Sequence, residues 1–313
     1  MKILCITPIK HIDGIWEVLS SAGQILYHPY ASQSDTYEII QKECPVALFV
    51  NPNQMSFRLD RTVLTNCIKV ICTASTGLHH IDVDYCENNN IKVISLITDY
   101  KTTNKISSTA ELAFGLMLSL IRNIPSAYSS VQQYQWRYEP FIGRQLNALS
   151  VGIIGYGRLG SMMAHYCQTF GMQTYLCDPK LTNGYSLEDL VRKVDIVSLH
   201  VHLSSKTRHM INQRVLGQSK KGLYLINTSR GSVVDESAVI WALQEGILQG
   251  YATDVIEDEL EDISKSQLIK ASHRMNIIIT PHIGGMTREA QQIAYKAAAA
   301  KLVNWIKGIK HEM

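Results

Sequence analysis

A glycine-rich segment near the middle of the chain has the residue types and spacing of a phosphate-binding turn. Gly155, Gly157 and Gly160 follow an apolar run and open a helical pattern. The first glycine allows a tight turn, the second lets the backbone approach a pyrophosphate, and the third permits close packing of helix on strand. The helix N-terminus adds free N–H groups and the positive end of its dipole. We therefore predict a dinucleotide-binding turn formed by Gly155, Tyr156, Gly157, Arg158, Leu159 and Gly160.

An acid follows at the distance that a dinucleotide site requires. Asp178 ends the next apolar run, Tyr-Leu-Cys-Asp, eighteen residues after Gly160. A carboxylate there accepts hydrogen bonds from the adenosine ribose hydroxyls and repels a 2′-phosphate, which favours NAD over NADP. Lys180 weakens this preference, because a nearby cation could hold the phosphate. The alternative interpretation is a glycine turn that binds no ligand.

Three further polar stretches end predicted strands in the second half of the chain. Arg230 follows Leu-Ile-Asn-Thr-Ser, Asp254 precedes a run of acids, and His282 lies between Thr-Pro and Ile-Gly-Gly. Open α/β sheets place their ligands at the carboxyl ends of parallel strands. These stretches are therefore candidates for one shared site.

The elements that position these residues are short apolar runs alternating with longer helical patterns. This alternation predicts an α/β fold with parallel sheets covered by helices on both faces. The expected strands are 3–7, 47–50, 70–73, 92–95, 150–154, 173–177, 196–200, 223–227 and 277–280. A long helix is expected over 104–122, an irregular arm from residue 128 to 145, and a C-terminal helix over 288–307 that could return to the first domain.

Length and composition limit the class of protein. A chain of 313 residues, 46% hydrophobic and 18% charged, predicts about two globular domains. A net charge of +3 gives no reason to expect nucleic acid or an acidic membrane as partner. The seven cysteines include no C-x-x-C pair, so we expect buried thiols in a reducing compartment, no disulfide framework and no zinc ribbon. The N-terminus predicts a strand and no signal peptide, and no apolar run reaches the ~18 residues of a membrane span. These features favour a cytoplasmic protein.

Taken in order, the motifs resemble the D-isomer-specific 2-hydroxyacid dehydrogenase family, which includes D-lactate, glyoxylate/hydroxypyruvate and 3-phosphoglycerate dehydrogenases. The resemblance covers nearly the whole chain. It rests on GYGRLG with Asp178, DIVSLHVHLSSKTRHMIN, NTSRGSVVD and PHIGG, and on the earlier stretches TASTGLHHIDVD and STAEL.

The resemblance implies a fold and an assembly. It implies two Rossmann-like domains with the active site in the cleft between them. A flavodoxin-like substrate domain would span 1–100 plus 287–313, completed by the C-terminal helix, and an NAD-binding domain would span 101–286. It also implies a homodimer formed through the nucleotide domain and an arm like 128–145.

The resemblance also assigns catalytic roles by position. The arginine falls on Arg230, the acid on Glu259 and the histidine on His282, with Glu257 and Glu261 as rival acids. A guanidinium holds and polarises a 2-oxo acid, and an imidazole supplies the proton as hydride arrives from the nicotinamide. Glu259 would bond the other ring nitrogen and fix the tautomer. Backbone N–H groups would bind the substrate carboxylate at Ser75, Thr76 and Gly77.

Further cofactor contacts follow from the same motifs. Besides the glycine turn, the resemblance implies Asp178, His200, Val201, His202, Thr207, Thr228, Ser229, Asp254, Gly284, Gly285 and Thr109. Asp254 would face the nicotinamide carboxamide. His200-x-His202 has metal-like spacing but no evident third ligand, so no metal is expected.

Three positions depart from the family pattern. His202 replaces the usual proline of the central motif, Leu260 replaces a proline after the acid, and Thr73 stands where some relatives that handle phosphorylated acids have arginine. The last departure argues against a 3-phosphoglycerate substrate. The function predicted from sequence is an NAD-dependent D-2-hydroxyacid dehydrogenase. The alternative is an NAD(H)-binding sensor or corepressor of the same fold with little turnover.

Overall fold

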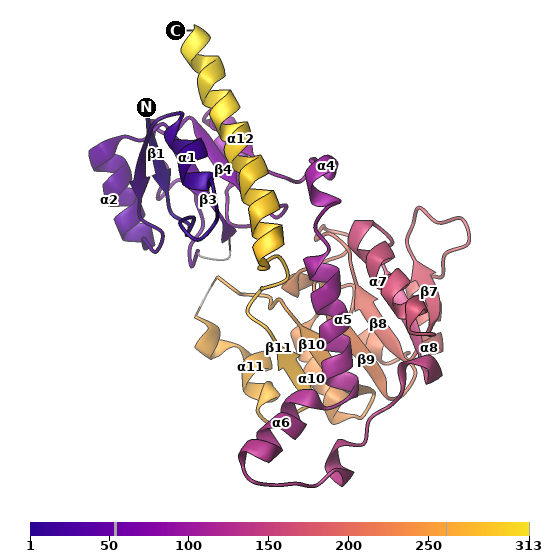
Figure 1. Cartoon of the computed structure of the whole chain (residues 1–313). Helices are drawn as coiled ribbons and strands as arrows, with labels where there is room; N and C mark the ends of the chain where they lie inside the picture. The colour runs from indigo at the N-terminus through magenta and orange to yellow at the C-terminus, as the bar shows by residue number, and fades with distance from the viewer. Residues whose placement is uncertain (53–54, 261, 313) are drawn as a thin grey trace. The chain divides into compact units, whose positions relative to one another are not determined.

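The chain forms two compact units, each built on its own parallel sheet (Figure 1). The computed structural model describes residues 1–52, 55–260 and 262–312. Unit 1 comprises Met1–Ile106 and Gly285–Met313, and unit 2 comprises Ser107–Gly284. The chain thus leaves unit 1 after residue 106, where the sequence suggested 100. The reason is local packing, because Ile106 contacts the apolar core of unit 1 and Asp99 pairs with Lys301 at 2.8 Å.

The sheet of unit 1 has five parallel strands in the order β2-β1-β3-β4-β5. They are β1 (Lys2–Cys5), β2 (Gln24–Tyr27), β3 (Ala47–Val50), β4 (Val70–Thr73) and β5 (Lys92–Ile94). β3 and β4 are buried throughout, which explains their unbroken apolar sequence. The strand order is that of a flavodoxin-like sheet, as predicted. β2 was missed because this partly exposed edge strand has no unbroken apolar run.

Helices from both ends of the chain cover this sheet. They are α1 (Ile15–Ser20), α2 (Gln33–Glu43), α3 (Val83–Asn88), α4 (Tyr100–Thr103) and α12 (Arg288–Glu312). The C-terminal helix α12 buries Ala298, Leu302 and Ile306 in the same apolar cluster as Ile3 and Phe49. It completes unit 1, because without it this face of the sheet would be exposed to water.

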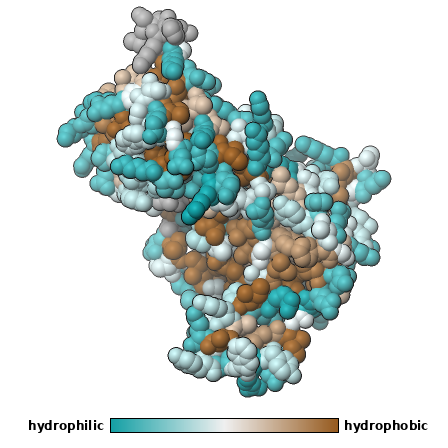
Figure 2. Space-filling model, viewed as in Figure 1, coloured by the Kyte–Doolittle hydropathy of each residue, from teal (hydrophilic) through white to brown (hydrophobic). Residues whose placement is uncertain are grey.

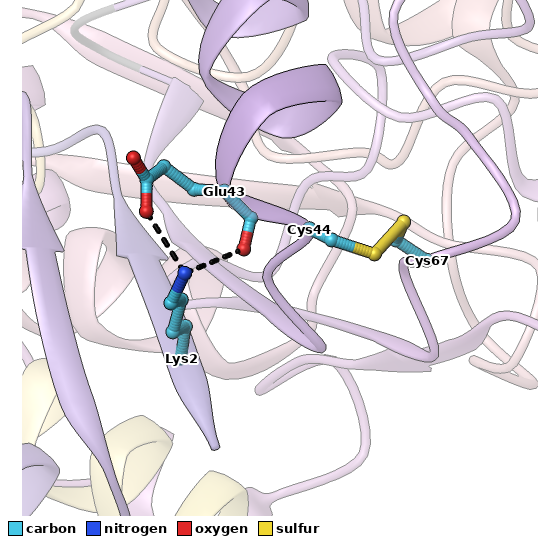
Figure 3. Close-up of a disulfide and its surroundings, with 4 residues drawn as sticks. All are labelled: Lys2, Glu43, Cys44 and Cys67. Atoms are coloured by element: carbon cyan, nitrogen blue, oxygen red, sulfur yellow. Dashed lines mark hydrogen bonds and ion pairs between the residues drawn. A yellow bond between two sulfur atoms is a disulfide. The ribbon is translucent and has the colours of Figure 1, made fainter.

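A disulfide joins Cys44, just after α2, to Cys67 in the segment before β4 (Figure 3). Next to it, the Lys2 ammonium donates to the Glu43 carboxylate at 2.9 Å and to the Glu43 carbonyl at 3.1 Å. The prediction that the cysteines are all buried thiols is therefore wrong. Spacing along the sequence did not reveal this pair, because the fold brings together residues 23 positions apart. Because two cysteines form a disulfide, the cysteine content no longer indicates a reducing compartment. The cytoplasmic location stays a prediction.

The sheet of unit 2 has six parallel strands in the order β11-β10-β9-β8-β6-β7. They are β6 (Ser150–Ile154), β7 (Gln173–Cys177), β8 (Ile196–Leu199), β9 (Leu223–Asn227), β10 (Leu248–Thr253) and β11 (Ile277–Ile279). All strands run the same way, so the polar residues that follow β6, β8, β9, β10 and β11 come to one edge of the sheet.

Helices cover both faces of this sheet as well. The α-helices are α5 (Ser108–Ile121), α6 (Ile124–Gln132), α7 (Arg158–Thr169), α8 (Leu187–Lys193), α9 (Gln213–Leu216), α10 (Glu236–Gln244) and α11 (Gln267–Ser272). Short 3₁₀ turns occur at η2 (Glu139–Phe141), η3 (Leu146–Ala148), η4 (Gly231–Val233) and η5 (Ile263–Lys265). The arm expected to be irregular begins as helix α6, which Pro125 in its first turn favours. Among the described residues no helix has the length and apolar character needed to cross a bilayer.

Candidate active site

Two glycines of the turn after β6 are required by the fold itself. Gly155 has φ +89°, and a Cβ there would lie 2.7 Å from the carbonyl oxygen of His200. A Cβ on Gly160 would lie 2.0 Å from the carbonyl oxygen of Gly155. The turn and the first residues of α7 are therefore packed backbone against backbone, as a Rossmann turn requires.

Gly157 is different, because nothing in the chain demands a glycine there. Its φ is −83°, and a Cβ at this position would meet no atom within 4 Å. It caps the N-terminus of α7, where backbone N–H groups lack helical acceptors and the helix dipole is positive. Open space above a bare backbone at a helix N-terminus fits the close approach of a pyrophosphate.

The Asp178 carboxylate is hydrogen-bonded to the backbone of this turn. Its Oδ2 accepts from the Tyr156 amide at 2.8 Å and its Oδ1 from the Lys180 amide at 2.9 Å. Each carboxylate oxygen keeps a lone pair that could accept from a ribose hydroxyl. The residues of this turn therefore fit the adenosine and pyrophosphate parts of a dinucleotide.

The loop after β8 carries the two histidines of the central motif. Burial lowers the pKa of His200 to about 4, and its Nε2 lies 2.9 Å from the Ser198 hydroxyl. His202 is exposed, and its carbonyl accepts from the Thr207 hydroxyl at 2.6 Å. That hydroxyl also accepts from the Ser204 amide at 2.8 Å. Thr207 thus holds the loop at His202 through the carbonyl of that residue, while Val201 before it is half-buried.

The turn after β9 is shaped by Asn227. Its Oδ1 accepts from the Ser229 amide and hydroxyl at 3.0 and 2.7 Å, and its Nδ2 donates to the Arg230 carbonyl at 3.0 Å. The buried Thr228 hydroxyl has no hydrogen-bond partner among the described residues. A buried hydroxyl without a partner costs free energy, so this atom fits a polar group of a bound ligand.

Arg230 presents a half-buried guanidinium. Its Nη1 donates to the Ser229 carbonyl at 2.6 Å. Burial lowers its pKa from the ordinary value, and the Glu259 charge opposes that shift. A guanidinium stays protonated despite such a shift, so Arg230 remains a fixed cation close enough to Glu259 to be affected by its charge.

Asp254 ties the end of β10 to the loop after β11. Its Oδ1 accepts from the Thr280 hydroxyl at 2.5 Å and the Ile283 amide at 2.9 Å, and its Oδ2 accepts from the Gly284 amide at 2.7 Å. Burial raises the pKa of Asp254. A Cβ on Gly284 would lie 3.1 Å from both Asp254 Oδ2 and a methyl of Thr109, so these three predicted residues meet.

His282 and Glu259 form the pair on which the chemistry depends. His282 Nδ1 lies 2.9 Å from Glu259 Oε2, with the two side chains 26% and 20% exposed. His282 has φ +53°, a left-handed conformation unusual outside glycine, and its amide is held by the Asp254 carbonyl at 2.9 Å. Such backbone strain persists where surrounding contacts impose it, which is common at functional sites.

The structure distinguishes two of the three rival acids, Glu257 and Glu259. Glu257 is engaged elsewhere, accepting from Arg208 Nη2 at 2.7 Å and from His209 Nε2 at 2.9 Å. Glu259 is the one that contacts His282. Glu261 lies outside the described residues. Local composition does not distinguish these acids, which are spaced two apart; the family resemblance placed the acid on Glu259, five residues after Asp254.

In unit 1, the predicted substrate loop follows β4. The Thr73 hydroxyl lies 3.0 Å from that of Ser75, which donates to the Gly77 carbonyl at 2.7 Å, and His80 Nε2 lies 3.1 Å from Thr73. The amides of Ser75, Thr76 and Gly77 donate to no acceptor among the described residues. Three such amides in one tight loop can bind an anion.

Sequence reasoning missed several residues that shape these turns. Asn227 and Thr280 hold neighbouring loops through their side chains, and Arg208 and His209 hold Glu257. For Asn227 and Thr280 the one signal was their position at the carboxyl end of a predicted strand, where loops carry functional residues. Arg208 and His209 lie in the longer loop after β8 and gave no such signal. Within the described residues, no group of three or more His, Cys, Asp or Glu could hold a metal ion.

Residues 114–284 match the family model for the D-isomer specific 2-hydroxyacid dehydrogenase, NAD binding domain. The chain belongs to this family. The match ends at Gly284, where unit 2 ends, so unit 2 holds the NAD-binding domain of the family. The glycine turn, Asp178 and the Thr228 hydroxyl are the features of this domain that fit the cofactor.

Curated relatives and solved structures of the family cover most of the chain. A glyoxylate reductase from Thermococcus litoralis is 32% identical over 80% of this chain and 78% of its own length. A D-3-phosphoglycerate dehydrogenase from Methanocaldococcus jannaschii is 31% identical over 98% of this chain and 58% of its own. The D-lactate dehydrogenase of Aquifex aeolicus, solved with NAD and lactic acid, is 27% identical with a TM-score of 0.80, covering 100% of this chain and 97% of that one.

Family members therefore differ in the substrate that they are named for. The chain spans about half the length of the phosphoglycerate dehydrogenases that it matches, at 46% for the Bacillus subtilis protein. Its match to the Aquifex structure extends over nearly both whole chains.

Proposed function

We propose that this protein is an NAD(H)-dependent oxidoreductase that interconverts a 2-oxo acid and a D-2-hydroxy acid. The observation that carries the proposal is the hydrogen bond between His282 and Glu259, whose charge acts on the half-buried cation Arg230. An acid–base pair and a guanidinium at one sheet edge are the groups that carbonyl reduction needs besides its cofactor.

Arg230 binds the substrate carboxylate and polarises its carbonyl. The planar guanidinium matches a carboxylate in two-point geometry and keeps its charge. Its Nη1 is held by the Ser229 carbonyl, so the side chain is oriented before substrate arrives. Partial burial strengthens its attraction for an anion, because less water screens the charge.

His282 moves the proton at the substrate oxygen. Glu259 accepts from Nδ1, which leaves Nε2 to donate to the carbonyl oxygen during reduction and to take the proton back during oxidation. When bound, the dihydronicotinamide supplies the hydride. The glycine turn and Asp178 would hold the adenosine half, and Thr228 has a buried hydroxyl for the remainder.

Unit 1 is proposed as the substrate domain and unit 2 as the cofactor domain. The backbone amides of Ser75, Thr76 and Gly77 donate to no acceptor among the described residues, which supports this division. In the proposed function they would bind the substrate carboxylate. Thr73 is uncharged and already bonded to Ser75 and His80. A substrate whose far end carries no phosphate is therefore favoured.

The test is turnover. NADH and a panel of 2-oxo acids, from glyoxylate and pyruvate to hydroxypyruvate and bulky branched acids, are mixed with the protein, and absorbance at the nicotinamide band is followed. Oxidation of NADH with at least one acid is expected, with a D-hydroxy acid as product. Tight NADH binding without turnover on any of them would overturn the proposal and favour a sensor.

We further propose that the protein is a homodimer formed through α6 and the arm that follows it. This segment exposes an apolar series, with Tyr134 and Trp136 100% and 88% exposed. Its other members are Ile124, Tyr128, Val131, Tyr138 and Ile142. Figure 2 shows further apolar residues at the surface around α5. Large apolar side chains exposed along one segment are typical of an association site.

Sedimentation velocity tests the dimer. Trp136→Ser with Ile142→Ser should shift the protein toward monomer, whereas Tyr30→Ser, which removes an exposed ring from unit 1, should not. A monomeric wild-type protein at micromolar concentration would overturn this proposal.

A further inference from the structure

The segment that carries Glu259 is held in place by contacts of the residue two positions earlier, Glu257. Its amide donates to Glu236 Oε1 at 2.9 Å, at the start of α10. A Cβ on Gly231 would lie 2.0 Å from the carbonyl carbon and oxygen of Ile256 and 2.4 Å from the Glu257 nitrogen. The residue after Arg230 therefore lies directly against the backbone that leads to Glu259.

The Glu257 side chain adds a third attachment. One oxygen, Oε1, accepts from Arg208 Nη2 at 2.7 Å and from His209 Nε2 at 2.9 Å. His209 is itself held, because its amide donates to the Ser232 carbonyl at 2.8 Å and its φ is +48°. These contacts turn the Glu257 carboxylate toward the segment after β8, whereas Glu259 contacts the histidine after β11.

We infer that Glu257 is a positioning residue, which with Arg208, His209 and Glu236 holds the segment 256–259 so that Glu259 bonds His282 at a fixed distance from Arg230. The inference rests on the proposed function. It also gives Glu257 a second effect, since an acid occupied by two donors does not compete with Glu259 for the histidine.

A plain surface ion pair would not have this role. Exposed pairs contribute little to stability, because water screens them and long side chains lose freedom. Here the Glu257 side chain is only 22% exposed and has two donors, and its own amide is bonded as well. Burial raises the pKa of Glu236, and the neighbouring carboxylates of Glu257, Asp258 and Asp235 add to that effect. Because several acids lie together at this end of α10, the donors Arg208 and His209 offset their mutual repulsion.

The matched variants are Glu257→Gln and Glu188→Gln. Glu188 also pairs with an arginine of unit 2, Arg214, at 2.9 Å, on α8. With the 2-oxo acid that gives the highest rate, Glu257→Gln should lower kcat about tenfold, less than the roughly 10²-fold to 10⁴-fold lost when the proton-transferring group itself is removed. NADH affinity and the melting temperature should stay near wild type. Glu188→Gln should leave kcat unchanged.

A double-mutant cycle separates positioning from a general structural effect. If Glu257 acts through Glu259, adding Glu257→Gln to Glu259→Gln should cost no further rate, because the interaction that it supports is already gone. Losses that multiply in the double variant would overturn the inference.

Failure of the positioning role of Glu257 can be distinguished from failure of the proposed function. If Glu259→Gln and His282→Gln both leave turnover intact, the proposed function fails. If both lower it and Glu257→Gln does not, the positioning inference alone fails. A crystal structure of Glu257→Gln gives a readout without turnover. The distance from His282 Nδ1 to Glu259 should exceed about 3.5 Å, and a pair retained at its wild-type distance would overturn the inference.

Discussion

The two sheets share one topology, yet their strand ends carry different chemistry. With strands counted within each unit, both follow the order 2-1-3-4-5, and unit 2 adds a sixth strand, β11. The first turn of unit 1, after β1, is filled by buried side chains such as Ile9 and Ile12. The corresponding turn of unit 2 is Gly155–Gly160, with open space at Gly157. Topology therefore fixes where a ligand can bind, and the side chains at that place decide whether one does.

The fourth strands of the two units sharpen the contrast. After β4, hydroxyls of Thr73 and Ser75 shape a loop whose backbone amides are available to an anion. After β9, Asn227 shapes a loop that presents a guanidinium at Arg230. Unit 1 thus offers neutral donors and unit 2 offers charged groups. In the proposed function the first hold the substrate and the second act on it.

The largest expected effect tests whether the charged groups of unit 2 carry the reaction. His282→Gln removes the proton donor and should lower kcat by about a thousandfold, within the range of general acid–base catalysis. NADH affinity, measured by fluorescence titration, should change less than about twofold, since the adenosine contacts remain. His11→Gln, at an exposed position in unit 1, is the matched control and should keep most activity. Near-normal turnover of the 282 variant would remove this histidine from the mechanism.

Unit 1 contains the disulfide between Cys44 and Cys67, and the described part of unit 2 contains none. Opening the Cys44–Cys67 bond frees a loop of 23 residues in the unfolded chain, which should cost about 3 kcal/mol of stability. Calorimetry with and without reductant should show a lower melting temperature for unit 1 and unchanged NADH binding. The Cys44→Ser, Cys67→Ser double variant should be insensitive to reductant. A wild-type protein that reductant does not destabilise would contradict the prediction.

A smaller effect arises from a buried base at a strand end of unit 2. Burial lowers the pKa of His200 to about 4, so the ring stays neutral in the folded chain at pH 5, while the unfolded chain takes up a proton below about 6.5. Stability should therefore fall by about 2 kcal/mol between pH 7 and pH 5 through this residue. Melting curves of His200→Asn should lack this loss, whereas His11→Asn, at an exposed position in unit 1, should retain it. Equal pH dependence in wild type and His200→Asn would refute the assignment.

The smallest effect tests the glycine turn that distinguishes unit 2. Gly157→Ala adds a methyl in open space at an ordinary φ, so the melting temperature should hardly change. The methyl should nevertheless weaken NADH about tenfold by standing where the pyrophosphate approaches. Gly115→Ala, which also meets no atom within 4 Å, is the control and should bind NADH normally. Unaltered NADH affinity in the 157 variant would place the dinucleotide elsewhere.

Local patterns predicted much of the fold. Short, largely apolar runs identified β3, β4, β6, β7 and β9 with the bounds that the structure gives them. The same patterns missed β2, at a sheet edge, gave no range for β10, and treated the start of α6 as irregular. Edge strands and exposed helices bury little apolar surface, so their sequences carry a weaker period.

The sequence by itself determined the parallel α/β class, the glycine turn, and the order in which Arg230, the acids and His282 follow strand ends. Each of these depends on neighbours within a few residues. Tertiary structure alone decided that Cys44 pairs with Cys67. The contact of Glu259 with His282 and the completion of unit 1 by α12 were expected from the family resemblance, and no local pattern indicated them. These pairings join residues far apart in the chain, and packing and loop geometry select among partners that local periodicity leaves equivalent.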